Sequence, residues 1–270
     1  MEYRTKILIV EGNRIETAAY GPSPADAPTL VFLHEGLGCV SLWKDFPKRL
    51  SEITGYGTFM YSRLGYGGSG PSVLPRPVTF MHDEASRLLP LILKEARIHQ
   101  HLLIGHSDGG SIALIYAGKN QPETLAGIIT EAPHVFCEDK LVRSITKVVQ
   151  AYEKGGLRDR LEKHHGDNIE NAFWGWANVW RDPDFAHWNI EAYLAKIRVP
   201  VLVIQGADDE YATLAQVQSI VAKCGAPAAS LILEACGHSP HGDQESETLQ
   251  AMATFVAKVL PAESTSTPTA

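Results

Sequence analysis

Short apolar runs recur along the chain, and most of them are followed by a stretch with helical periodicity. We predict strands at residues 6–10, 14–20, 28–33, 58–62, 101–104, 125–130, 199–204 and 229–233. The first two flank Glu11-Gly12-Asn13, a turn signal, so they are expected to pair as an antiparallel hairpin. The run at 28–33 is continuously apolar, which is typical of a strand buried on both faces of a parallel sheet.

Segments with helical periodicity separate the strands. We predict helices at residues 43–53, 80–98, 107–119, 214–223 and 246–260, and Pro90 should kink or split the second of them. A hairpin followed by strand–helix repeats predicts a mostly parallel sheet with helices on both faces. Ligands of such sheets bind at the carboxyl ends of the strands, so the chemistry is expected in the loops that follow strands.

The alternation breaks in the second half of the chain. Between about residues 137 and 197 the pattern is helical and contains no convincing strand, which predicts a helical insertion above the sheet. Residues 261–270 contain no apolar anchor and are expected to be disordered.

Composition narrows the class of protein. The 270 residues carry 24 Lys and Arg against 31 Asp and Glu, and the net charge of −7 argues against binding nucleic acid through bulk charge. No apolar run approaches the roughly 18 residues of a membrane span, and the N-terminal run is too short for a signal peptide, so a cytoplasmic protein is expected. The four cysteines are widely spaced, which favours reduced thiols over a disulfide framework or a zinc site.

The strongest local motif is Gly105-His106-Ser107-Asp108-Gly109, which has the form G-x-S-x-G. It follows a predicted strand and precedes a predicted helix, which is the context of a nucleophile elbow. The sharp turn strains the serine backbone, the glycines let the turn close, and the helix N-terminus favours developing negative charge. We therefore predict that Ser107 is a nucleophile and that the side chain of His106 diverges from it.

A serine hydroxyl needs a base, and the base needs an acid to orient it. His238 lies in the loop after the last predicted strand and is the expected base, with His241 as the competitor. Asp208 and Asp209 stand in the loop after the preceding strand. The chain order of serine, acid and histidine is that of a hydrolase triad. We favour Asp209 as the acid and keep Asp208 as the alternative.

With these motifs the chain resembles the α/β-hydrolase superfamily over nearly its whole length. The segments that carry the resemblance are residues 34–38, 62–69, 105–109, 206–209 and 237–239. The first of them, His-Glu-Gly-Leu-Gly, is similar to the family's oxyanion loop. The resemblance then implies that the backbone N–H groups of Gly36 and Asp108 hold the oxyanion. It also implies that Asp209, at the end of a G-x-x-D motif, is the acid.

The resemblance further implies an eight-stranded sheet and a domain organisation. Residues 1–133 and 199–260 would form the core, and residues 134–198 fall where the family inserts a helical cap. One residue departs from the family pattern, because Glu35 stands where relatives usually have glycine. Its carboxylate is expected either to make a structural hydrogen bond away from the site, which we favour, or to enter the site and select a substrate group.

Two other patterns indicate different chemistry and are weaker. Residues 65–70 match G-x-G-x-x-G, but prolines follow at 71, 75 and 77, where a dinucleotide-binding fold needs a helix. His164, His165 and His187 lack a further metal ligand at a suitable spacing, so we expect them on the solvated surface. We therefore expect neither a metal nor an organic cofactor.

The predicted insertion contains four of the five tryptophans of the chain. Most of its aromatic side chains are expected to form the core of the insertion itself, and one or two of them to face Ser107. The expected pocket residues are His34, Glu35, Trp174, Trp176 and Trp180.

Together these features predict a serine hydrolase that cleaves a small or medium carboxylic ester, with an apolar or aromatic acyl group, through an acyl-enzyme on Ser107. Thioester hydrolysis and carbon–carbon bond cleavage of ring-fission products are alternatives that use the same triad. The second of these often needs a basic side chain for a substrate carboxylate, for which Arg63 and Arg181 are the candidates. A third alternative is a non-catalytic ligand-binding protein. The expected partner is a small molecule, not nucleic acid or a membrane, and the expected state is a monomer or homodimer.

Overall fold

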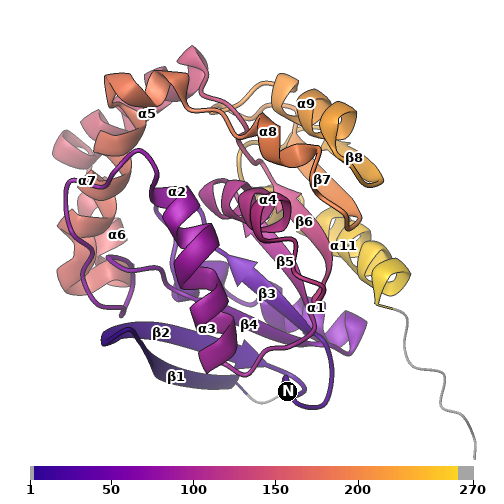
Figure 1. Cartoon of the computed structure of the whole chain (residues 1–270). Helices are drawn as coiled ribbons and strands as arrows, with labels where there is room; N and C mark the ends of the chain where they lie inside the picture. Colours follow the sequence, from indigo (N-terminus) through magenta and orange to yellow (C-terminus); the bar gives the residue numbers. More distant parts are fainter. Residues whose placement is uncertain (1–2, 261–270) are drawn as a thin grey trace, which may run out of the picture.

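An eight-stranded sheet runs through the computed structural model, which describes residues 3–260 (Figure 1). The strand order across the sheet is β1-β2-β4-β3-β5-β6-β7-β8. The strands are β1 (Tyr3–Val10), β2 (Asn13–Tyr20), β3 (Thr29–Leu33), β4 (Gly57–Tyr61), β5 (His101–His106), β6 (Leu125–Glu131), β7 (Val201–Gly206) and β8 (Ala228–Leu233). β2 pairs antiparallel with β1 and with β4, and the other pairs are parallel. The predicted mostly parallel sheet with an N-terminal hairpin is confirmed.

Burial along the strands explains why the central runs are apolar. Every residue of β3, β4, β5 and β7 is buried, because helices cover both faces of the middle of the sheet. β1 and β8 lie at the two edges, and most of their side chains keep contact with solvent. Ser107 and Asp209 therefore follow two of the fully buried strands, β5 and β7, whereas His238 follows the edge strand β8.

Two helical layers enclose the sheet. On one face, α1 (Phe46–Thr54) and α11 (Glu245–Val259) share an apolar cluster with the strands through side chains such as Leu50, Met252 and Phe32. On the other face, α3 (Leu89–Glu95), α4 (Asp108–Asn120) and α9 (Ala215–Lys223) belong to a second apolar cluster. α4 is buried along most of its length, which gives the turn before it a rigid support.

The predicted helix at residues 80–98 is split. A short α2 (Phe80–Asp83) passes through a π-helical turn, η2 (Glu84–Leu88), into α3. Pro90 is the second residue of α3, so its missing N–H leaves a carbonyl in the preceding turn without its usual helical partner. A wider turn just before the proline absorbs that break.

The segment between β6 and β7 is helical. It contains α5 (Asp139–Lys154), α6 (Leu157–His165), η3 (Gly166–Asn168), α7 (Ile169–Trp180), η4 (Pro183–His187) and α8 (Glu191–Leu194). In Figure 1, α5, α6 and α7 lie together at the upper left, beside the sheet and away from α11. The short α8 instead packs against α4 and α9 of the core layer. The division at residues 134–198 stays a prediction, since helix packing alone draws no sharp boundary there.

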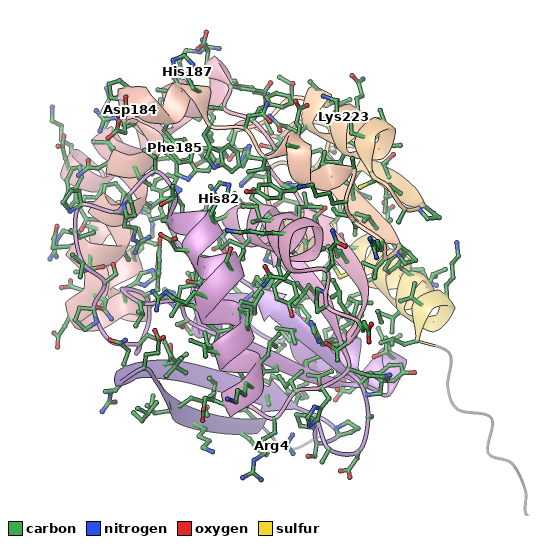
Figure 2. The ribbon with its side chains drawn as sticks, in the orientation of Figure 1. Arg4, His82, Asp184, Phe185, His187 and Lys223 are labelled. Atoms are coloured by element: carbon green, nitrogen blue, oxygen red, sulfur yellow. The ribbon has the colours of Figure 1, made fainter. Side chains whose placement is uncertain are left out.

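Aromatic side chains fill the inside of this helical segment. Phe185 of η4 points inward and is fully buried, whereas Asp184 and His187 on either side of it point outward into solvent (Figure 2). The Phe185 ring stacks on Trp188 at 5.3 Å and lies 4.4 Å from the Trp180 ring, measured between centroids. Most of the aromatic residues therefore form the core of the segment.

One expectation about this segment is wrong. His165 is buried and not solvated, because it joins α6 to two loops of the core. Its Nδ1 accepts a hydrogen bond from the N–H of Gly67 (3.1 Å), and its Nε2 donates to the carbonyl of Leu37 (3.0 Å). Within residues 3–260 no helix is long and apolar enough to cross a membrane. The prediction of disorder at 261–270 lies outside the described residues.

Candidate active site

Ser107 lies in a sharp turn between β5 and α4. Its backbone φ of 52° and ψ of −115° lie in a region that residues other than glycine rarely adopt, so the turn is strained. A Cβ on Gly105 would lie 2.3 Å from the carbonyl oxygen of Gly109, and one on Gly109 would lie 2.0 Å from that of Leu33. Because only glycine fits at both positions, the G-x-S-x-G pattern has a steric reason here.

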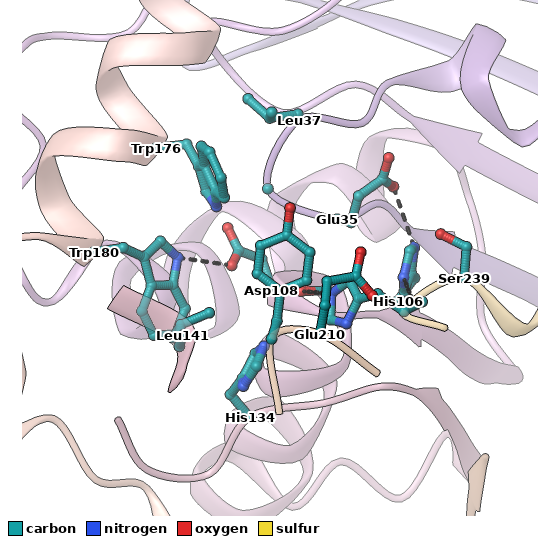
Figure 3. Close-up of a pocket in the computed structure, with 14 residues that line it drawn as sticks. Glu35, Leu37, His106, Asp108, His134, Leu141, Trp176, Trp180, Glu210 and Ser239 are labelled. Carbon is teal, nitrogen blue, oxygen red and sulfur yellow. Dashed lines mark hydrogen bonds and ion pairs between the residues drawn. The ribbon is translucent and has the colours of Figure 1, made fainter. Parts of the chain in front are cut away.

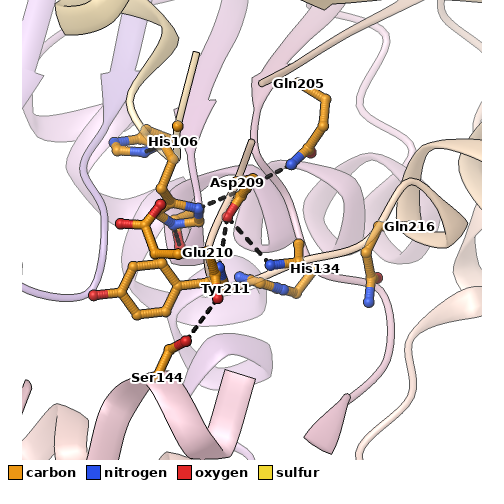
Figure 4. Close-up of polar contacts among 12 residues, drawn as sticks. His106, His134, Ser144, Gln205, Asp209, Glu210, Tyr211 and Gln216 are labelled. Atoms are coloured by element: carbon orange, nitrogen blue, oxygen red, sulfur yellow. Dashed lines mark hydrogen bonds and ion pairs between the residues drawn. The ribbon is translucent and has the colours of Figure 1, made fainter. Parts of the chain in front are cut away.

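A continuous chain of hydrogen bonds leads from Ser107 to a buried carboxylate. The Oγ of Ser107 lies 2.9 Å from Nε2 of His238, and Nδ1 of His238 lies 2.8 Å from Oδ2 of Asp209. Asp209 also accepts hydrogen bonds from the N–H groups of Tyr211 (2.7 Å) and Ala212 (3.2 Å), as Figure 4 shows. Burial raises the pKa of this carboxyl, but His238 and the N–H of Tyr211 outweigh that effect and lower its pKa to about 2.

Asp208 and His241, the alternative acid and the alternative base, make other contacts. Asp208 is exposed, and its N–H donates to the carbonyl of Cys236. His241 places its Nδ1 2.8 Å from Oε2 of Glu131, a buried carboxylate at the end of β6. The geometry therefore brings Asp209 and His238 to Ser107.

His106, next to Ser107 in the chain, turns away from it and supports His238. Its Nε2 donates to the backbone carbonyl of His238 (2.7 Å), and its Nδ1 lies 3.5 Å from Oε2 of Glu35. Burial lowers the pKa of His106, but Glu35 raises it more strongly, to about 9. The same pairing holds the pKa of Glu35 well below its usual range. The Glu35 carboxylate thus makes a structural contact, and it also lines the cavity beside Ser107.

A cavity of about 210 Å³ opens in front of Ser107 (Figure 3). Trp176 and Trp180 of α7 form its wall on the side of the helical segment, with Leu141 of α5. Glu210 and Tyr211 close it beside His238. Its acidic members are Glu35, Asp108 and Glu210, and no lysine or arginine of the described residues 3–260 lines it.

Gly36 and Asp108, the expected oxyanion donors, both line this cavity. As the first residue of α4, Asp108 has an N–H without a partner inside the helix. A Cβ on Gly36 would lie 2.1 Å from Nε1 of Trp176, so the indole packs directly against the loop. The glycine at this position is therefore required by a contact with α7.

Two expected pocket residues lie outside the cavity lining. His34 is fully buried, where its Nε2 accepts a hydrogen bond from the N–H of Arg63 (3.0 Å) and its Nδ1 donates to the carbonyl of Glu35 (2.7 Å). Trp174 instead donates from its Nε1 to Oε2 of Glu170 (2.9 Å). Of the three tryptophans, only Trp176 and Trp180 line the cavity, because they lie four residues apart on one face of α7, whereas Trp174 lies on another face.

The two arginines considered for a substrate carboxylate are also outside the lining. Arg63 is 4% exposed and points into the core, and Arg181 is exposed at the end of α7. In the part of the chain that the structure describes, no group of three or more His, Cys, Asp or Glu side chains is placed to hold a metal ion.

Sequence reasoning missed His134, which is 1% exposed and lines the cavity. Its ring stacks on that of His238 with centroids 5.8 Å apart, and it meets the Trp180 ring edge to face with centroids 5.4 Å apart. Burial and the neighbouring His238 lower the pKa of His134 to about 3, so it stays neutral and does not compete as a base. Its place just after β6 is a signal that was present in the sequence, because chemistry is expected at such strand ends.

The model of a family described as "Alpha/beta hydrolase family" matches residues 30–251. The chain belongs to the alpha/beta hydrolase family. Similar members include a 2-succinyl-6-hydroxy-2,4-cyclohexadiene-1-carboxylate synthase of Enterobacter sp. (strain 638), which is 30% identical over 59% of this chain and 54% of that protein. A 2-hydroxy-6-oxononadienedioate/2-hydroxy-6-oxononatrienedioate hydrolase of Paraburkholderia phymatum is 24% identical over 77% of this chain and 80% of that protein. The match to the synthase thus spans about half of that relative's length.

Solved alpha/beta hydrolase structures share the fold over almost the whole chain. An esterase from Exiguobacterium antarcticum has a TM-score of 0.74 at 19% identity and covers 94% of this chain and 99% of its own. A structure described as a putative lipase from Acinetobacter baumannii has a TM-score of 0.74 at 20% identity, covering 95% and 92%. At these identities the likeness establishes the fold, and the reaction must be argued from the site.

Proposed function

We propose that this protein is a serine hydrolase that cleaves a small carboxylic ester through an acyl-enzyme on Ser107. The observation that carries the proposal is the unbroken chain from Ser107 through His238 to Asp209 at the wall of the cavity. His238 would take the proton of Ser107 as the hydroxyl attacks the ester carbonyl, and would later give it to the leaving alcohol. Asp209, ionised at neutral pH, would stabilise the imidazolium that forms in between.

Charge on the carbonyl oxygen would be held by the backbone N–H groups of Gly36 and Asp108. Both residues line the cavity next to Ser107, which supports this assignment. One such donor typically accounts for about 100- to 1000-fold in kcat. Water activated by His238 would then attack the acyl-enzyme and release the acid.

The cavity supports a compact substrate. Its volume of about 210 Å³ exceeds the roughly 150 Å³ that accommodates a benzene molecule and is below the roughly 300 Å³ of a typical ligand pocket. Apolar walls from Trp176, Trp180 and Leu141 suit an acyl group of about one ring. The absence of lysine and arginine from the lining disfavours the dicarboxylate for which the Paraburkholderia relative is named. We therefore favour ester cleavage over carbon–carbon bond cleavage.

Covalent labelling tests the proposal. A fluorophosphonate probe is expected to modify Ser107 of the native protein, as located by peptide mass spectrometry. Ser107→Ala should abolish labelling and His238→Ala should slow it strongly. Ser239→Ala is the matched control, because the Ser239 side chain lines the same cavity but its hydroxyl is not part of the hydrogen-bond chain from Ser107 to Asp209, and this variant should label like the native protein.

A second pair of variants separates the two aspartates. Asp209→Ala is expected to lower kcat for an aryl ester by about 1000-fold or more, since the acid holds the tautomer and orientation of the base. Asp208→Ala, its exposed neighbour, should leave kcat nearly unchanged. If the native protein neither reacts with the probe nor cleaves aryl esters, the protein binds ligands without catalysis and the proposal is wrong.

A further inference from the structure

Arg63 lies in the loop that follows β4 and sends its side chain beneath the loop that carries Gly36. Its guanidinium donates to the backbone carbonyl of His34 and, from Nη2, to that of Glu35 (3.0 Å). The N–H of Arg63 donates to Nε2 of His34 (3.0 Å), which ties the two loops together a second time. Nearly all of the arginine is hidden from solvent, so it faces the backbone and not the cavity.

The contact with Glu35 acts directly on the expected oxyanion donor. The carbonyl of Glu35 and the N–H of Gly36 belong to one planar peptide unit, in which the two groups point in opposite directions. Arg63 shares this oxygen with Nδ1 of His34 (2.7 Å) and the N–H of Gly38 (3.1 Å), and by holding it Arg63 helps to set the direction of the Gly36 N–H. A charged donor on the oxygen also polarises the peptide, which strengthens the hydrogen bond that its N–H donates.

The same guanidinium reaches the second donor. Nη2 of Arg63 lies 3.6 Å from Oδ2 of Asp108, whose own N–H is the other expected donor. Oδ1 of Asp108 accepts a hydrogen bond from Nε1 of Trp180 (3.0 Å), as Figure 3 shows. The Asp108 carboxylate is thus clamped between the core and α7, and it is only 1% exposed.

Resting on the proposed function above, we propose that Arg63 is a positioning residue that holds the Gly36 and Asp108 N–H groups in convergent directions. One guanidinium contacts both segments, which come from loops after two different strands. It is placed for this role and not for binding a substrate carboxylate, because the cavity wall does not include it. The oxyanion site of this protein therefore depends on a side chain that never touches the substrate.

The conservative variant Arg63→Lys tests this role. Lysine keeps the positive charge but lacks the planar fork that serves two carbonyls and a carboxylate together. We expect kcat for an aryl ester to fall by about 10- to 100-fold with KM nearly unchanged, since a donor is misdirected and not removed. Arg76→Lys is the matched control. The guanidinium carbon of Arg76 lies 4.4 Å from the centroid of the Tyr66 ring, in the same loop as Arg63, and Arg76 contacts neither Gly36 nor Asp108.

A pair of inhibitors distinguishes positioning from a general loss of structure. A trifluoromethyl ketone matched to the ester adds Ser107 Oγ to its carbonyl carbon and places a negative oxygen in the oxyanion site. The corresponding secondary alcohol binds the cavity without that oxyanion. In Arg63→Lys the inhibition constant of the ketone should rise by the same factor as kcat falls, and that of the alcohol should change by less than about threefold.

The double variant Arg63→Gln/Asp108→Asn removes both charges and avoids leaving a lone buried carboxylate. It should reproduce the ketone-specific loss, with the unfolding midpoint recorded for each variant. The proposal is overturned if folded Arg63→Lys keeps kcat within threefold, if ketone and alcohol weaken together, or if both variants fail to fold, which would assign Arg63 to fold stability alone. Failure of the proposed function itself is separate, because it would show as an unlabelled native protein.

Discussion

Around Ser107, the polar side chains form hydrogen bonds with backbone atoms as well as with one another. Asp209 accepts two backbone N–H groups besides His238, which keeps it ionised and aligned. His106 holds the same histidine from the other side, through the backbone carbonyl of His238. The base is therefore positioned twice, once through its ring by Asp209 and once through its main chain by His106.

The Glu35–His106 pair gives the protein a predicted pH dependence. Because the folded-state pKa of His106 is raised to about 9 from 6.5, the folded chain keeps a proton that the unfolded chain loses. This stabilisation is fully present below about pH 6.5, provided that Glu35 is ionised, and it is lost as the pH rises toward 9. The free energy of unfolding should fall by up to about 3 kcal/mol over this range.

Urea titrations at pH 6.0, 7.5 and 9.0 check this prediction. Glu35→Gln removes the carboxylate that raises the pKa of His106, so its stability should depend much less on pH over the same range. Glu210→Gln is the control, since this carboxylate lines the cavity without pairing with His106, and its curve should run parallel to that of the native protein. Equal slopes for the native protein and Glu35→Gln would contradict the assignment.

Gly36 is the position at which one added methyl group should matter most. Gly36→Ala places a Cβ in the space of the Trp176 indole, so either the oxyanion loop or the indole must move. We expect kcat/KM to fall by about 10- to 100-fold. Trp176→Ala in the same chain should recover part of that loss, because it vacates the space. Gly70→Ala, where the nearest atom would be 3.6 Å away, should be neutral. Losses that simply multiply in the double variant would argue against the steric explanation.

At the scale of elements, α7 is what joins the helical segment to the chemistry. Trp176 packs against Gly36 and Trp180 hydrogen-bonds Asp108, so α7 touches both expected oxyanion donors. The last residue of α6 and the turn η3, which lead directly into α7, make polar contacts with the loop after β4. His165 binds Gly67, and Asn168 donates from Nδ2 to the carbonyls of Gly67 (3.0 Å) and Ser69 (2.7 Å). A shift of α7 should therefore affect both substrate binding and the oxyanion site.

His165→Leu tests one of these attachments. It leaves the N–H of Gly67 and the carbonyl of Leu37 without their partner, so we expect a loss of about 2–4 kcal/mol in the free energy of unfolding. His164→Leu, one position earlier, removes only a contact with the exposed Ser41 hydroxyl and should cost less than about 1 kcal/mol. Urea unfolding of the two variants gives both free energies of unfolding. Equal losses in the two variants would show that His165 does not attach this segment to the loop.

At the scale of the whole molecule, the cavity lies where the core meets the inserted helices, and its three carboxylates all come from outside the helical segment between β6 and β7. Glu35 and Asp108 are offset by His106 and Arg63, whereas Glu210 faces the cavity and forms no ion pair with any residue between 3 and 260. Lys140 of α5 instead donates to the backbone carbonyls of Asp209 (2.5 Å) and Ala212 (3.0 Å). The cavity is therefore acidic, in keeping with the net charge of −7.

An ester series tests the effect of that charge. Two aryl esters that differ only by a carboxylate on the acyl ring should differ in kcat/KM by about tenfold or more, with the uncharged ester preferred. Glu210→Gln should narrow the difference, and Asp184→Asn, an exposed carboxylate on η4, should leave it unchanged. Preferential cleavage of the carboxylate ester by the native protein would contradict this account and favour the ring-fission chemistry.

The sequence predicted the fold more completely than the site. Alternating apolar runs and helical stretches determine strands such as 101–104 and the helix after them, because periodicity depends on near neighbours. The triad candidates also follow from short motifs at strand ends. The sequence could not show that His165 is buried, that His134 lines the cavity or that Trp174 does not, since those outcomes depend on how α6 and α7 pack.

By itself, therefore, the sequence determined the order of strands and helices along the chain and the turn that carries Ser107, and it favoured His238 and Asp209 as partners while leaving His241 and Asp208 open. The tertiary structure decided where Arg63 points, which tryptophans face the cavity and what Glu35 contacts. These contacts join distant residues, with sequence separations of 29 positions for Arg63 and His34 and 72 for Trp180 and Asp108. No local pattern encodes such pairs, because they form only when packed strands and helices bring their loops to the same edge of the sheet.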